Sequence, residues 1–304
     1  MRDRQKKVRR GFTLIELLTA ISIIAMLIAI LSVGARRVTI ISRELRQKSV
    51  FHAMTVGLEL FNNDFDGYPD SRLRGGGTNR VTGAQHLAEA LQGRDHQGFD
   101  PRSGWYPPND PADLYTNSDA SLARRRGPYF EMKHGEIRRV SELWETTGTS
   151  QIYASAANAP PRAWAPMITD VFNRNTAPDG RRVGMPILYF KADPASPFRI
   201  DANREEVVNP NQSQYSRWTY NFSDNLPVIN LPWLRDPEID GAAVHYQDPD
   251  GGDKNAAQVF YEQITQRAEP DRHFFRPHNR DTFILISAGW DGVFGTRYDV
   301  VNFD

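Results

Sequence analysis

The pattern of hydrophobic and polar positions begins with one long apolar stretch. It extends from Phe12 to Ala35, and no charged residue occurs between Leu17 and Val33. At about 1.5 Å per residue, a helix of this length reaches roughly 36 Å, more than the ~30 Å of a bilayer's hydrocarbon core. A cleaved signal peptide has a shorter apolar region followed by a small-residue cleavage site. The pattern therefore predicts a retained transmembrane segment over residues 12–35.

The helical pattern continues beyond this stretch into a more polar segment. No proline occurs before Pro69, and Gly67 and Pro69 together form a helix stop, with Gly67 suited to the C-cap. We therefore predict one helix over residues 12–65. Residues 36–68 form the exposed part of this N-terminal helical region, outside the membrane. Its apolar positions at helical spacing are Ile41, Leu45, Phe51, Met54, Leu58 and Phe61.

Residues 69–304 differ in character, because most of the prolines and glycines lie here. Short apolar runs predict strands over 186–192, 218–222 and 282–288. Helical spacing predicts helices over 83–91, 136–145 and 256–267. Residues 93–161 are rich in turn residues, which predicts an insertion on the surface. The expected fold class is α+β: a long N-terminal helix packed on a small antiparallel sheet, with a large loop-rich insertion.

Composition narrows the class of protein. The 304 residues are 39% hydrophobic and 24% charged, as in folded chains, and a mean hydropathy of −0.56 excludes a polytopic membrane protein. The absence of cysteine excludes disulfides, thiolate metal sites and iron–sulfur clusters. A net charge of zero argues against a nucleic-acid partner. That zero conceals a basic head, since residues 1–11 carry six basic side chains and one acidic, which is typical of a targeting signal.

The sequence at this boundary has a specific form. Arg9 and Arg10 precede Gly11 and Phe12, and Glu16 lies in the apolar run that follows. This arrangement resembles the processing signal of type IV pilins and type II secretion pseudopilins. The resemblance implies that residues 1–11 are a cytoplasmic leader and that a prepilin peptidase/methyltransferase cleaves after Gly11 and methylates Phe12. It also implies that Glu16 is the acid that directs assembly.

The charge of Glu16 is consistent with that role. A carboxylate costs about 2.5–3.5 kcal/mol at the centre of a membrane helix on insertion scales, and less when it is paired. Cleavage after Gly11 would create an ammonium group on Phe12. We expect the Phe12 ammonium of one subunit to meet Glu16 of its neighbour, which would set the register of a filament. The simpler alternative is that Glu16 lies near the helix end and reaches the headgroups.

The C-terminal segment resembles the last part of major pseudopilins, which end with a strand, a Gly-x-Asp-Gly turn and a calcium-binding acidic loop. Here Gly289–Gly292 forms the turn, and Asp291 and Asp299 are the matching carboxylates. Calcium prefers six to eight oxygen ligands. Arg297 departs from the family pattern and should weaken binding. The alternative to calcium is a turn held by Asx-type hydrogen bonds.

These features predict a structural subunit of a type II secretion pseudopilus and no enzymatic activity, because no phosphate-binding loop, nucleophile elbow or paired-histidine metal motif is present. Expected partners are copies of itself or other pseudopilins, the prepilin peptidase/methyltransferase and the secretion system's inner-membrane platform. The expected location is the bacterial inner membrane, single-pass, with most of the chain periplasmic. The alternative is a membrane-anchored pilin-like surface or binding module, or a type IV pilus subunit.

Overall fold

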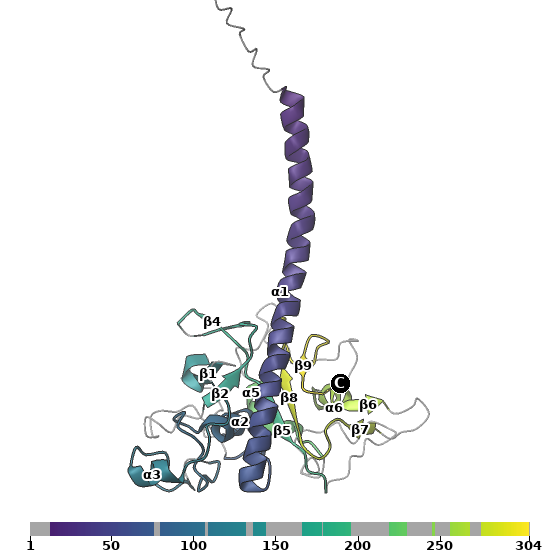
Figure 1. The fold of residues 1–304 in the computed structure, drawn as a ribbon. Helices are drawn as coiled ribbons and strands as arrows, with labels where there is room; N and C mark the ends of the chain where they lie inside the picture. Colours follow the sequence, from purple (N-terminus) through teal and green to yellow (C-terminus); the bar gives the residue numbers. More distant parts are fainter. Residues whose placement is uncertain are drawn as a thin grey trace, which may run out of the picture. The chain divides into compact units, whose positions relative to one another are not determined.

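The structure is a computed structural model that describes residues 13–75, 80–106, 109–131, 136–143, 166–177, 179–195, 219–229, 245–246, 256–267 and 275–303. Its helices are α1 (Leu14–Phe65), α2 (Gly83–Gln92), α3 (Asp119–Arg124), α4 (Val140–Leu143), the 3-10 helix η4 (Phe222–Asn225), α5 (Leu226–Ile229) and α6 (Ala256–Gln263). Its strands are β1 (Glu136–Arg139), β2 (Pro166–Thr169), β3 (Asn175–Thr176), β4 (Arg182–Val183), β5 (Leu188–Lys191), β6 (Thr265–Arg267), β7 (Phe275–Pro277), β8 (Phe283–Ser287) and β9 (Val300–Val301). The predicted α+β class is confirmed (Figure 1).

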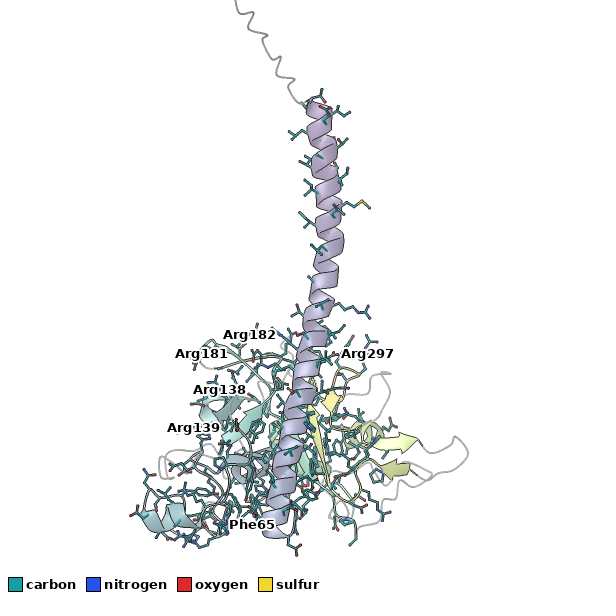
Figure 2. All side chains as sticks on the ribbon, viewed as in Figure 1. Phe65, Arg138, Arg139, Arg181, Arg182 and Arg297 are labelled. Atoms are coloured by element: carbon teal, nitrogen blue, oxygen red, sulfur yellow. The ribbon has the colours of Figure 1, made fainter. Side chains whose placement is uncertain are left out.

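The chain divides into two compact units, residues 1–43 and 44–304. In the first unit, α1 exposes large apolar side chains along its length, among them Leu14 at 82% and Met26 at 68%. Figure 2 shows these side chains standing out around the helix. Over the part of the chain that the structure describes, no helix combines the length and the apolar character needed to cross a membrane.

In the second unit, the last part of α1 buries one face. Its buried apolar side chains are Val50, Phe51, Met54, Leu58 and Phe61, which recur at helical spacing. Of the apolar positions predicted from the sequence, Ile41 and Leu45 are exposed instead.

The helix ends at Phe65, as predicted. Pro69 follows shortly afterwards, and a proline, which has no backbone N–H, cannot continue the helix. Asp66, the first residue after the helix, has the left-handed conformation, with φ of 55°. An aspartate tolerates this conformation better than most side chains.

The centre of the second unit is an antiparallel sheet in the order β5-β8-β9. Leu188 pairs with Ile286 and Lys191 with Phe283 between β5 and β8, and Ile286 pairs with Val301 between β8 and β9. Both β5 and β8 were predicted from their apolar runs, which are typical of strands covered on both faces.

Alternate side chains of these strands enter two different hydrophobic clusters. Tyr189, Phe283 and Leu285 pack with the buried face of α1 and with α2. Leu188, Phe190, Ile284 and Ile286 pack on the opposite face with Phe260 and Tyr261 of α6. The sheet therefore lies between α1 with α2 on one side and α6 with η4 and α5 on the other (Figure 1).

Asn225 connects α2 to this sheet. Its buried side chain donates a hydrogen bond from Nδ2 to the Tyr189 carbonyl (2.7 Å) and accepts one at Oδ1 from the Ala84 backbone N–H (2.8 Å). Asn225 thus satisfies one backbone group on β5 and one at the start of α2. The sequence predicted this helix over residues 83–91, and it spans Gly83–Gln92.

Three predicted elements differ from the structure. Of the helix predicted over 136–145, residues 136–139 form strand β1 and residues 140–143 the single turn α4, because β1 pairs with β2 along its whole length; residues 144 and 145 lie outside the described residues. In the segment 218–222, residues 219–221 are not in a strand and Phe222 begins η4, while Trp218 lies outside the described residues. The helix predicted over 256–267 ends at Gln263 and β6 follows, paired with β7.

The segment predicted to be a surface insertion also contributes to the core. Phe99 packs against Phe61 near the end of α1, with ring centroids 5.1 Å apart, and Phe130 joins the cluster that covers the sheet. The remaining paired strands, β3 and β4, form a short hairpin.

Candidate functional site

The predicted processing site lies at the boundary of the described residues. Gly11 and Phe12 both fall outside them. Thr13 is described, and α1 begins at Leu14 immediately after it.

Glu16 folds back onto Thr13. Its Oε2 accepts hydrogen bonds from the Thr13 backbone N–H (2.8 Å) and from Thr13 Oγ1 (2.7 Å), and the Glu16 backbone N–H donates to Thr13 Oγ1 (3.3 Å). This reciprocal pattern is a capping box, with Thr13 at the N-cap and Glu16 three residues later. The Glu16 side chain therefore satisfies the Thr13 backbone N–H at the start of α1.

Sequence reasoning missed Thr13. The signal was present, because Thr-x-x-Glu before an apolar run is the pattern of a capping box, and Thr13-Leu14-Ile15-Glu16 fits it. Both hydrogen bonds that the Glu16 side chain accepts end at Oε2. The carboxylate thus has a local role besides the expected contact with a neighbouring subunit.

The second predicted site is the loop between β8 and β9, where the structure brings Asp291 and Asp299 close together. Thr296 connects them: its Oγ1 donates to Asp291 Oδ2 (2.9 Å), and its carbonyl accepts the Asp299 backbone N–H (3.2 Å). Asp291 Oδ1 also accepts a hydrogen bond from the Val293 N–H (3.1 Å). The bond between Asp291 and Val293 is an Asx-type turn, the kind of contact that the sequence offered as the alternative to a metal.

Asp299 keeps one carboxylate oxygen without a partner. Oδ2 accepts hydrogen bonds from the Gly295 N–H (2.8 Å) and from Gln263 of α6, whereas Oδ1 is buried and bonds to no described residue. Burial, with a smaller contribution from the neighbouring Asp291, raises the pKa of Asp299 to about 8. A buried oxygen with no partner costs free energy, and a cation would relieve that cost.

The donors in this loop are of the type that calcium prefers, but they are few. Across the described ranges, no group of three or more His, Cys, Asp or Glu side chains is placed to hold a metal ion. A calcium ion bound by Asp291 and Asp299 would need further oxygens from backbone carbonyls or water. Arg297 does not compete for these carboxylates, because its guanidinium lies over the Tyr298 ring, 4.7 Å from the centroid.

The comparisons with known proteins bear on the N-terminal segment. Residues 6–32 match the family model of the prokaryotic N-terminal methylation motif, consistent with the prepilin-type cleavage and methylation signal of pilin-like proteins. The match includes Gly11, Phe12 and Glu16 and supports a type IV pilin-like protein. No curated protein and no solved structure matches the chain.

Proposed function

We propose that this chain is a structural, non-enzymatic subunit of a type II secretion pseudopilus. Its apolar N-terminal segment would anchor it as a single-pass protein in the bacterial inner membrane, with the sheet-containing unit in the periplasm. The observation that carries the proposal is the methylation motif over residues 6–32, which includes an acid, Glu16, among exposed apolar side chains. The resemblance of the Gly289–Gly292 turn and its acidic loop to major pseudopilins favours a secretion system over a surface pilus.

Assembly would follow from the electrostatics of the mature N-terminus. Cleavage after Gly11 by the prepilin peptidase/methyltransferase would leave an N-methylated ammonium on Phe12. In a filament, Glu16 of one copy, or of another pseudopilin, would meet this ammonium on a neighbour. Breaking a buried ion pair typically costs about 3–5 kcal/mol, which corresponds to more than a hundredfold in each assembly step.

Processing is tested first, by mass spectrometry of the N-terminus of membrane-extracted protein. We expect N-methyl-Phe12 as the first residue, and we expect the variant Gly11→Val to retain its leader. A mature chain beginning near Ala35 would contradict the prepilin-type signal.

Assembly is tested with variants that separate the charge of Glu16 from its capping role. Glu16→Gln removes the charge but keeps a residue that completes a capping box, Glu16→Leu removes both, and Thr13→Val removes the capping hydroxyl alone. All three are compared for processing, membrane extraction and crosslinking into multimers.

If Glu16 acts by pairing with an ammonium, Glu16→Gln and Glu16→Leu should both be processed yet fail to form multimers, whereas Thr13→Val should assemble. Multimers of normal length from Glu16→Gln would show that the residue acts only as a helix cap. Normal multimers from all the variants would favour a displayed pilin-like module instead of a filament subunit.

The choice between a pseudopilus and a type IV pilus needs a cellular measurement. Deletion of the gene should block export of secreted proteins and leave surface pili intact, because the pseudopilus would work with the inner-membrane platform of the secretion system. Loss of surface pili with normal export would identify a pilus subunit.

We also propose that Asp291 and Asp299 bind calcium. The unpartnered buried oxygen of Asp299 supports this proposal, because a divalent cation would supply the missing partner. When bound, calcium would neutralise the two carboxylates and hold the loop between β8 and β9.

A further inference from the structure

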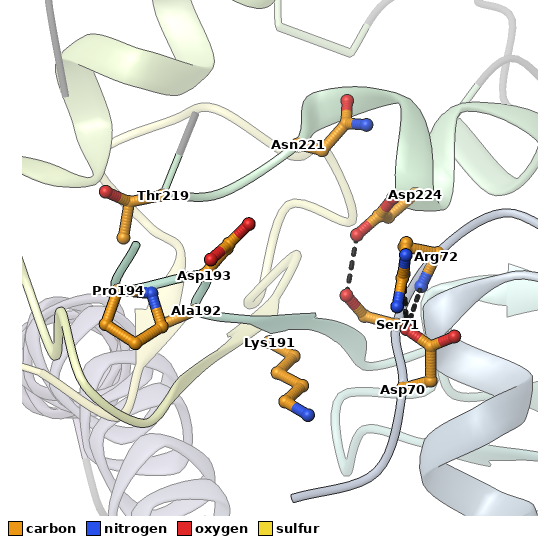
Figure 3. A pocket seen from close by; sticks show the side chains of 10 residues that line it. All are labelled: Asp70, Ser71, Arg72, Lys191, Ala192, Asp193, Pro194, Thr219, Asn221 and Asp224. Atoms are coloured by element: carbon orange, nitrogen blue, oxygen red, sulfur yellow. Dashed lines mark hydrogen bonds and ion pairs between the residues drawn. The ribbon is translucent and has the colours of Figure 1, made fainter. Parts of the chain in front are cut away.

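A cavity of about 380 Å³ lies in the second unit, and its lining includes neither Asp291 nor Asp299. It is bordered by residues that follow the end of α1, by the end of β5 and by η4 (Figure 3). Its volume is at the lower end of the ~300–1,000 Å³ range of small-molecule sites. Charged side chains line it from all three segments, among them Asp70, Arg72, Lys191, Asp193 and Asp224.

Asp224 is an incompletely satisfied carboxylate in the wall of this cavity. Its residue is only 2% exposed. Oδ2 accepts a hydrogen bond from Ser71 Oγ (2.6 Å), while Oδ1 is buried and bonds to no described residue. Asn225, the next residue, is fixed by its bonds to Tyr189 and Ala84, so η4 holds Asp224 in place.

The environment of Asp224 favours a cationic partner. Burial, assisted by repulsion from Asp70, raises the pKa of Asp224 to about 7, although hydrogen bonds from Ser71 and the Leu73 backbone and the charge of Arg72 oppose this shift. Arg72 is itself engaged, because its Nε lies 3.1 Å from Asp70 Oδ1. A cation that entered the cavity would therefore find in Asp224 Oδ1 a buried acceptor that forms no direct ion pair with a described residue.

Lys191 supplies the opposite charge. It is the last residue of β5, its side chain is half-buried, and within the described ranges it forms no ion pair. Lys191 and Asp224 line the same cavity, but no direct ion pair joins them, and Figure 3 shows the Lys191 side chain extending away from Asp224. Asp193, which also lines the cavity, accepts a hydrogen bond at Oδ1 from the Ala195 N–H (3.2 Å).

We propose that this cavity binds a small zwitterion of the amino-acid class, whose ammonium group contacts Asp224 and whose carboxylate contacts Lys191. One molecule with both charges would satisfy both side chains, which a simple amine or a simple carboxylate does not. This binding role goes beyond filament formation and does not depend on it.

The test uses the full processed chain in an uncharged detergent, titrated by calorimetry with glycine, β-alanine, γ-aminobutyrate, δ-aminovalerate and ε-aminocaproate. This series varies the distance between the two charges. We expect saturable binding that is tightest at one chain length. Butylamine and butyrate, which carry one charge each, should bind at least about tenfold more weakly than the best member, because each lacks one charge-assisted hydrogen bond.

Two variants locate the binding site, and each has a matched control. Lys191→Met should weaken zwitterion binding about tenfold or more, whereas Lys48→Met, which removes an exposed lysine of α1, should not. Asp224→Asn should also weaken it, whereas Asp170→Asn, which changes another buried aspartate outside the cavity lining, should not.

Lys191 is partly exposed, so its replacement leaves the fold testable even if Asp224→Asn does not fold. The proposal is overturned if no member of the series gives saturable heat, or if Lys191→Met binds as well as Lys48→Met. Neither result would alter the tests of processing and assembly, which involve only the N-terminal segment.

Discussion

Asp170 is a buried carboxyl group that joins three parts of the second unit. Its Oδ1 accepts hydrogen bonds from the backbone N–H groups of Phe172 and Met185, both at 3.1 Å. Its Oδ2 accepts one from Ser287 Oγ of β8 (2.9 Å). Despite these bonds, burial raises the pKa of Asp170 from its ordinary 3.8 to about 7.

The raised pKa makes stability depend on pH. Between about pH 4 and pH 7 the unfolded chain has an ionised Asp170, whereas the folded chain keeps it protonated, so unfolding releases a proton. The stabilising contribution of Asp170 to the free energy of unfolding is therefore fully present below about pH 4, and it is lost as the pH rises through about 7. At ~1.4 kcal/mol per pKa unit, the loss from this one group approaches about 4 kcal/mol.

The variant Asp170→Asn tests this reasoning, because asparagine cannot ionise and keeps an oxygen for the two backbone donors. Unfolding of the full chain in uncharged detergent is followed by tryptophan fluorescence in urea from pH 4 to pH 8. We expect the wild type to lose several kcal/mol relative to Asp170→Asn across this range. Taking the difference removes the contributions of other titrating groups, and Asp281→Asn serves as an exposed control. A difference that changes by less than about 1 kcal/mol would refute the raised pKa.

Three further predictions concern stability. Asn225→Ala should lower the free energy of unfolding by about 2–4 kcal/mol, because the Tyr189 carbonyl and the Ala84 backbone N–H both lose their hydrogen-bond partner. A loss under about 1 kcal/mol in urea denaturation would contradict this prediction. Gly57→Ala should destabilise by about 1–3 kcal/mol, although alanine favours helices, because its Cβ would lie 2.7 Å from the Tyr129 carbonyl oxygen; higher stability in the same assay would contradict it. Millimolar calcium should raise the melting temperature of the wild type but not of Asp291→Ala, and no rise in the wild type would reject the calcium proposal.

Local sequence signals determined the elements that need no distant partner. The apolar run and the absence of proline predicted α1, and Pro69 explains why it stops close to Phe65. The runs that became β5 and β8 are apolar at successive positions, because both faces of the sheet are covered. The same kind of signal identified Gly11, Phe12 and Glu16, which lie within one short motif.

Tertiary structure decided what depends on residues far apart in the chain. Residues 136–139 have a helical pattern but form β1, because their backbone groups pair with β2 about thirty residues later. Asp224 reads as an ordinary turn residue, and only the packing of η4 against Ser71 buries its carboxylate beside the cavity that Lys191 also lines. Burial and pairing are properties of the folded surroundings, so neither the unpartnered oxygen of Asp224 nor that of Asp299 could be predicted from local pattern.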